Sequence, residues 1–177
     1  MSHLPYRLFD IPGYQVKYLE FEDTPDLQTF LEKSPDYSLL TTGSPPTPFS
    51  AISLLTECPE GKKPNDKFDI DIYTRKLDLI GLLDTIRNYP AFHDWWVGLL
   101  LLDPDHRGRG LGSRVFQAFE KWVIHHGAQR IYLGVIEENR RAYQFWQELG
   151  FEPVERRPGK LAQGPNHIII EMERILM

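Results

Sequence analysis

Residues 95–126 read WWVGLLLLDPDHRGRGLGSRVFQAFEKWVIHH, and this run contains three successive elements. Its first part, Trp95 to Leu102, is apolar at nearly every position, which is typical of a strand covered on both faces. Three alternating glycines follow at positions 108, 110 and 112. Beyond them, apolar residues recur at helical spacing up to His126, and Gly127 is a suitable helix end. The run therefore predicts a buried strand, a glycine-rich loop and an amphipathic helix.

The glycine-rich loop has the properties of an anion-binding site. Glycine lets backbone N–H groups turn inward because no Cβ stands in the way. The helix that follows adds its own unpaired N–H groups and the positive end of its dipole. Arg107 and Arg109 supply positive charge. We therefore expect the loop to hold a pyrophosphate, the alternative being a glycine-rich turn with nothing bound.

Two well-known nucleotide-binding motifs also combine glycines with a helix N-terminus and must be considered for this loop. A P-loop is excluded because no Gly-Lys-Ser/Thr sequence follows the glycines. A Rossmann dinucleotide site has strand, glycines, helix and strand in the same order, with Glu137 or Glu138 after them. However, residues 103–107 separate the strand from the glycines. The roughly forty residues after the second strand are also too few for a doubly wound sheet.

The rest of the chain predicts one mixed sheet. Alternation of Asp69 and Asp71 with apolar neighbours indicates a strand with one solvent-exposed face. Further strands are expected at 14–21, 79–88, 130–135, 151–157 and 168–174, and further helices at 24–33, 49–57 and 139–149. The fold class is α+β, with an antiparallel meander, a central parallel pair of strands, and helices on both faces.

Composition limits the classes of function. A formal charge of −5 argues against a general nucleic-acid binder, which needs a basic face. Cys58 is the single cysteine, so an internal disulfide and a cysteine-based zinc site are excluded. The first residues contain no apolar signal region, and no run is long enough to span a bilayer. We expect a cytoplasmic protein with one domain over residues 1–177.

The sequence resembles the GNAT superfamily of acyl-CoA-dependent N-acetyltransferases in two motifs. The phosphate motif of that family, Arg/Gln-x-x-Gly-x-Gly/Ala after an apolar strand, is matched by Arg107, Gly110 and Gly112. A second signature, Asn-x-x-Ala-x-x-Phe/Leu-Tyr-x-x-x-Gly-Phe, is matched at five positions, namely Asn139, Ala142, Phe145, Gly150 and Phe151. The resemblance implies a GNAT-like fold and acetyl-CoA as co-substrate, without a metal.

The resemblance also implies how the cofactor is held. Backbone groups of Leu100 and Leu102 would bind pantetheine like an added strand, and the N–H near Leu100 would stabilise the oxyanion. The expected cofactor-binding residues are Leu100, Leu102, Arg107, Gly108, Arg109, Gly110, Leu111, Gly112, Ser113, Asn139, Tyr143 and Trp146. Arg140, Arg141, Arg156 and Arg157 are candidates for the 3′-phosphate, although exposed arginines need no such role.

The groups that transfer protons are less well specified. The family's acidic tyrosine aligns with Trp146, whose indole N–H is no useful acid, and its carboxylate aligns with Gly134. Tyr143, on the same helix face, is the candidate acid, with a structural tyrosine as the alternative. Base candidates are Asp69 and Asp71, which could instead form a solvated face, and the pair His93-Asp94, which could be ordinary surface.

Two interpretations of function follow. The first is direct acetylation of a primary amine in a small molecule or peptide, with no nucleic-acid or membrane partner and a homodimer left open. The second is a CoA-binding sensor that has kept the pocket and lost efficient chemistry. This interpretation is supported by Trp146 and Gly134, which stand where the family has proton-transferring residues.

Overall fold

The computed structural model describes residues 8–159 and 166–176, and the strands of this part of the chain form one sheet. The strand order is β1-β2-β3-β4-β5-β7-β6, and only β4 and β5 run parallel. The strands are β1 (Gln15–Tyr18), β2 (Lys67–Tyr73), β3 (Leu79–Arg87), β4 (Asp94–Leu102), β5 (Arg130–Ile136), β6 (Glu152–Gly159) and β7 (His167–Ile175). The predicted fold class, with its meander and central parallel pair, is confirmed.

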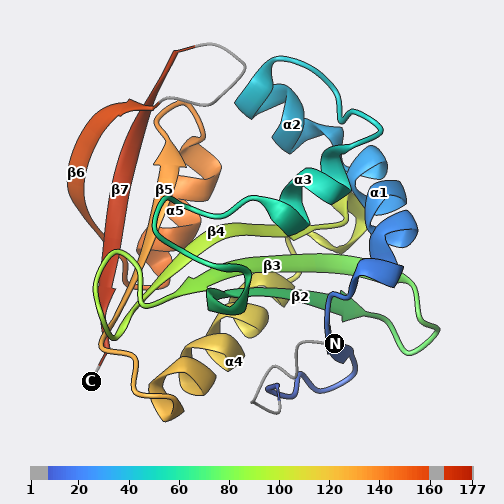
Figure 1. Cartoon of the computed structure of the whole chain (residues 1–177), viewed down its shortest axis with the longest axis horizontal. Helices are drawn as coiled ribbons and strands as arrows, with labels where there is room; N and C mark the ends of the chain where they lie inside the picture. The colour runs from blue at the N-terminus through green and yellow to red at the C-terminus, as the bar shows by residue number, and fades with distance from the viewer. Residues whose placement is uncertain (1–7, 160–165, 177) are drawn as a thin grey trace.

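Helices cover both faces of this sheet (Figure 1). On one face, α1 (Thr24–Lys33) and α3 (Ser50–Thr56) pack on Leu82 and Leu101, and α2 (Pro35–Thr42) lies beside them. On the other face, α4 (Leu111–His125) and α5 (Arg140–Glu148) enclose the larger hydrophobic core. Three short 3-10 turns complete the described elements: Phe21–Asp23, Pro64–Asp66 and Pro104–His106.

Two sequence-based expectations were wrong. Helix α2 was missed, although Ser34, Pro35 and Asp36 provide the same start signal as Thr24, Pro25 and Asp26 before α1. Its apolar residues do not repeat at helical spacing, so the pattern gave no second signal. The exposed face expected for β2 is also absent, because every residue of this strand is buried.

A β-bulge in β4 prepares the site. Asp84 on β3 lies opposite Leu99, and Thr85 lies opposite Val97, so Gly98 is an extra residue without a partner. The extra residue reverses which side chains face α4. Val97 faces α4 before the bulge, and Leu100 does so after it, whereas Leu99 packs with α1 and α3.

The parallel pairing also ends at this bulge. Strands β4 and β5 are paired from Asp94 and Arg130 to Val97 and Leu133, and not beyond. The β5-facing edge of β4 from Gly98 to Leu102 therefore has no strand partner among the described residues. An opening of this kind in a buried sheet leaves backbone groups available to a ligand.

Candidate active site

A cavity of about 340 Å³ occupies the opening between β4 and β5. Its wall includes Leu100 on β4, Gly134 on β5 and Trp146 on α5 from one side, and Tyr37 and Leu40 of α2 from the other. Elements on both faces of the sheet therefore line the cavity. A ligand bound on one face can contact a ligand bound on the other face through this opening.

The glycine-rich loop lies between β4 and α4, next to this opening. Gly108 and Gly110 have φ angles of +73° and +75°, which is the left-handed region that glycine adopts without strain. In the part of the chain that the structure describes, none of the six backbone N–H groups from Gly108 to Ser113 has an acceptor. Six unpaired donors at a helix N-terminus form a site for an anion with several oxygens.

The first turn of α4 also contacts α5. A Cβ on Gly112 would lie 3.2 Å from Cζ of Phe145, so the close approach of these helices requires glycine there. The two sequence signatures are thus in contact in the fold. Asn139 begins α5, and its Oδ1 accepts a hydrogen bond of 3.1 Å from the Ala142 N–H. This cap fixes Asn139 at the cavity wall.

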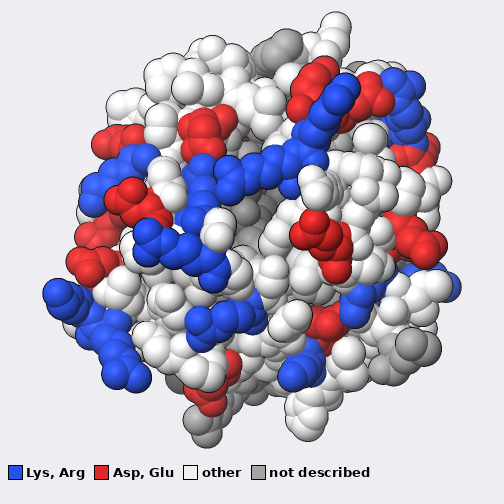
Figure 2. All heavy atoms as spheres, turned by 180° about the vertical axis from the view of Figure 1, so that it is seen from behind, with Lys and Arg blue, Asp and Glu red and all other residues white. Residues whose placement is uncertain are grey.

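The side chain of Arg107 is already engaged. Its Nε donates to the Leu102 carbonyl at 2.7 Å, and its guanidinium pairs with Asp36 on α2. The Leu102 carbonyl is therefore occupied as well. Arg109 is exposed. Figure 2 shows Lys and Arg side chains, with Asp and Glu side chains between them, on the face opposite that of Figure 1. An anion at this loop would therefore meet free backbone N–H groups, whereas the Arg107 guanidinium is already paired.

The residues around the expected proton-transfer positions form an apolar wall. Trp146 is buried, lines the cavity and packs with ring centroids 5.4 Å from Phe116 and 5.2 Å from Phe151. A Cβ on Gly134 would lie 2.9 Å from Cγ2 of Ile169, so β7 fills the space that a carboxylate would need. Tyr143 packs against the main core and is absent from the residues that line the cavity.

The other sequence candidates lie away from the opening or are already paired. Arg156 holds Glu137 through two hydrogen bonds, and Arg157 lies 3.4 Å from Glu171. Asp94 is buried at the start of β4, where burial raises the pKa of its carboxyl. The described residues contain no group of three or more side chains suited to a metal. They contain no helix of the length and apolarity needed to cross a bilayer.

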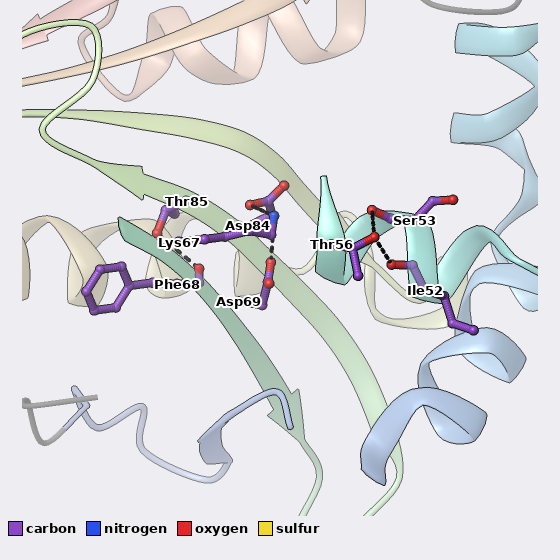
Figure 3. A network of polar contacts seen from close by, with 8 residues as sticks. All are labelled: Ile52, Ser53, Thr56, Lys67, Phe68, Asp69, Asp84 and Thr85. Atoms are coloured by element: carbon purple, nitrogen blue, oxygen red, sulfur yellow. Dashed lines mark hydrogen bonds and ion pairs between the residues drawn. The ribbon is translucent and has the colours of Figure 1, made fainter. Parts of the chain in front are cut away.

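Sequence reasoning named Asp69 as a base candidate but missed Lys67 and Asp84, with which it forms a buried charge cluster on β2 and β3. Figure 3 shows this cluster in the space beside α3. Lys67 Nζ lies 2.6 Å from Oδ1 of Asp84 and 3.1 Å from Oδ1 of Asp69. Burial, and then the adjacent Asp84 carboxylate, raise the pKa of Asp69 well above its usual value. Burial opposes the charge on Lys67, but the two carboxylates outweigh it and raise the pKa of this lysine.

This cluster forms the floor of a second cavity, of about 310 Å³, beneath α1, α2 and α3. The second cavity shares Tyr37, Thr41, Gly98 and Leu99 with the first, so the two adjoin. Burial of its hydroxyl end, together with Asp84, raises the pKa of Tyr37 to about 12. Only the β2 alternation pointed to this site, and the pairing partner on β3 could not be read from it.

Residues 39–151 match the sequence model of the acetyltransferase (GNAT) family. The chain belongs to this family. Membership, together with the fold, implies acyl transfer from an acyl-CoA to an amine. The matched region of this GNAT protein includes the β4 residues that line both cavities, Asp84 on β3, the glycine-rich loop and α5.

Relatives and solved structures agree with this assignment. An uncharacterized N-acetyltransferase of Bacillus subtilis, YobR, is 28% identical over 78 residues, which are 44% of this chain and 30% of that protein. An uncharacterized N-acetyltransferase of Methanocaldococcus jannaschii is 36% identical over 56 residues, 32% of this chain and 25% of its own length. The GNAT protein thus aligns with less than a third of these relatives' lengths.

The fold as a whole matches solved acetyltransferases. A crystal structure of an acetyltransferase from Thermus thermophilus has a TM-score of 0.75 and 26% identity, covering 93% of this chain and 97% of that one. A Vibrio cholerae spermidine N-acetyltransferase, solved with CoA and spermine, has a TM-score of 0.71 at 16% identity, covering 93% and 96%. The second likeness concerns the fold alone.

Proposed function

We propose that this GNAT protein transfers the acetyl group of acetyl-CoA to a primary amine. The observation that carries the proposal is the run of six unpaired N–H groups from Gly108 to Ser113, adjacent to the open edge of β4. A pyrophosphate needs several converging donors, and the open edge offers backbone groups to an extended pantetheine arm. Together they fit the pyrophosphate and the pantetheine arm of a CoA molecule.

The remaining expected contacts follow from this placement. Leu100 lines the cavity at the open edge, where its backbone N–H would stabilise the oxyanion of the attacked thioester. Asn139 and Trp146 line the same cavity and would flank the pantetheine arm. Tyr143 lies on the same helix, and its role as an acid stays a prediction. Leu102 would contribute its N–H alone, because Arg107 occupies its carbonyl.

A CoA-binding sensor is the second candidate function. It is favoured by Ile169, which fills the space beside Gly134, and by Trp146, which cannot act as an acid. Turnover separates the two candidates. A sensor would bind CoA and release no thiol with any amine.

Binding and turnover of the purified protein test the proposal. Thermal unfolding should shift upward with acetyl-CoA and with CoA, and remain unchanged with NAD, because only a bound ligand stabilises the folded state. Thiol release should then occur with at least one primary amine. Stabilisation by NAD without stabilisation by CoA would refute the proposal. A cytoplasmic location and a small-molecule or peptide acceptor remain predictions.

A further inference from the structure

The second cavity has a wall that accepts hydrogen bonds. Seven Ser and Thr residues line it: Ser34, Ser38, Thr41, Thr42, Thr47, Ser50 and Ser53. The hydroxyls of Ser38, Thr41 and Thr42 already donate to backbone carbonyls, each at 2.9 Å. A hydroxyl has one proton to donate and two lone pairs, so these groups can only accept toward the cavity.

Ser34 lacks a partner in this wall. Its residue is 2% exposed, and its Oγ has no hydrogen-bond partner in the described part of the chain. A buried hydroxyl without a partner costs free energy, on the order of 1–3 kcal/mol. The same residue lines the cavity, so a ligand there would satisfy it.

The charged groups that line the cavity are mostly acidic. Asp84 and Glu57 line it together with Lys67, giving two carboxylates for one ammonium, and Asp69 lies behind Lys67. Asp84 Oδ1 faces Lys67, while Oδ2 lies 2.9 Å from the position that a Cβ on Gly98 would occupy. Asp84 therefore reaches the bulge at which β4 leaves β5, where the two cavities adjoin.

We propose that this hydroxyl-lined cavity is the acceptor site, and that it takes a small cationic amine rich in hydrogen-bond donors, with Asp84 receiving the ammonium and its proton. This inference rests on the proposed function, which supplies the thioester. Lys67 and Asp69 are positioning residues, because they hold the Asp84 carboxylate without lining the path to the thioester. The volume of about 310 Å³ suits a small molecule.

The proposed reaction begins at the ammonium nitrogen. A proton passes from this nitrogen to a carboxylate oxygen of Asp84, and the freed lone pair forms a C–N bond with the thioester carbonyl carbon. The C–S bond breaks, and its electron pair leaves on the CoA sulfur. The nitrogen then loses its second proton and the sulfur takes up one proton, so the products are the amide and the CoA thiol.

Several charged or titratable groups surround Asp84. Lys67 forms an ion pair with Asp84, and Asp69 pairs with the same lysine. Tyr37 and Glu57 line the cavity, and the charge of Asp84 also acts on Cys58. The turnover of an Asp84 variant must therefore be compared with that of a variant outside the cavity. Asp66 provides the control, because it is a partly buried aspartate that pairs with Lys62 at 3.3 Å and does not line the cavity.

The test compares Asp84→Asn with Asp66→Asn. Asp84→Asn should lower kcat/KM for the amine at least a hundredfold, because an amide cannot take the proton from the ammonium. Its Kd for acetyl-CoA should stay within twofold of the wild-type value. Asp66→Asn should keep kcat/KM within threefold. Equal loss in both variants, or less than threefold loss in Asp84→Asn, would overturn the inference while leaving the proposed function intact.

A second variant keeps the test independent of Asp84. Ser34→Ala removes an unpartnered hydroxyl, so its unfolding temperature should equal or exceed that of the wild type. Its KM for the amine should rise several-fold, with kcat less affected. A lower unfolding temperature with an unchanged KM would mean that Ser34 is structural and would overturn its role in binding.

The wild-type protein should also discriminate among amines. With acetyl-CoA in excess, glucosamine and ethanolamine should be acetylated with at least tenfold higher kcat/KM than glutamate or a hexapeptide with a free N-terminus. Preference for glutamate or for the hexapeptide would overturn the acceptor class. Failure to bind acetyl-CoA at all would instead refute the proposed function.

Discussion

Arg107 and Asp36, 71 positions apart in the sequence, are joined through both terminal nitrogens of the guanidinium, with Nη2 and Oδ1 3.1 Å apart. The first residue belongs to the glycine-rich loop and the second to α2, so this pair links the proposed cofactor side of the site to the proposed acceptor side. The Arg107 hydrogen bond also lowers the pKa of the Asp36 carboxyl. The pair therefore persists to a lower pH than a free aspartate would allow.

Breaking this link should affect the acceptor more than the cofactor. Asp36→Asn should raise KM for the amine by about threefold to fivefold, since partly exposed pairs contribute about 0–1 kcal/mol. The Kd for acetyl-CoA, measured by calorimetry, should change less than threefold. Glu60→Gln, an exposed acid in a loop, is the control. Much tighter binding of acetyl-CoA to Asp36→Asn would show that Asp36 competes with phosphate for Arg107.

A negative charge introduced at position 110 should prevent the loop from binding phosphate. Gly110→Asn and Gly110→Asp have similar size, and both residues tolerate a positive φ better than other side chains do. The aspartate places a negative charge among the unpaired N–H groups, so its Kd for acetyl-CoA should exceed that of the asparagine variant by at least tenfold. Equal affinities, with equal unfolding temperatures, would contradict the assignment of this loop.

Gly98 should be required for the position of Asp84. An alanine Cβ there would lie 2.9 Å from Asp84 Oδ2, so the carboxylate would have to move. Gly98→Ala should lower kcat/KM for the amine about tenfold or more and leave acetyl-CoA binding within threefold. Unchanged turnover in Gly98→Ala would separate Asp84 from the reaction.

Asp71 should make stability fall as pH rises. Burial raises the pKa of Asp71 to about 7, and Tyr73, Lys17, Asp23 and Asp26 are the charged or hydrogen-bonding groups near it. The folded state then binds a proton that the unfolded state loses near pH 4, so this stabilisation is lost as pH rises from about 4 through 7.

The variant Asp71→Asn tests this dependence. Its free energy of unfolding at pH 8, from urea denaturation, should exceed the wild-type value by on the order of 2 kcal/mol, with a smaller difference at pH 4. Glu60→Gln should show no such change, because Glu60 is exposed. A wild-type stability that rises between pH 5 and 8 as steeply as that of the variant would contradict the prediction.

Local signals in the sequence were enough for most of the fold. The proline and acidic start signals placed α1 within a residue, although the cap is Asp23 and not Thr24, and the apolar stripe defined α4 within a residue or two. The two family signatures, around Gly110 and Asn139, were recognisable because each requires residues at fixed spacing in a single segment. These features depend on neighbours in the chain, which a sequence displays directly.

The acceptor side could not be predicted in the same way. The contact of Lys67 with Asp84 depends on the register between β2 and β3, and the access of Asp84 to the opening depends on the bulge at Gly98. Neither register nor bulge leaves a local pattern. The burial of β2 depends on elements from elsewhere in the chain, such as α3, which Figure 3 shows beside the Asp69 cluster, so alternating aspartates indicated an exposed face.

The extra residue at Gly98 has a consequence for how such a chain can change over time. Deleting one residue there would turn Leu99 to Leu102 over, exchanging the side chains offered to the two faces of the sheet. Insertions in the connections around α2 and α3 would leave the phase of β4 untouched. New acceptor preferences can thus arise through changes of length between residues 34 and 66, whereas a change of length in β4 would alter both faces of the sheet.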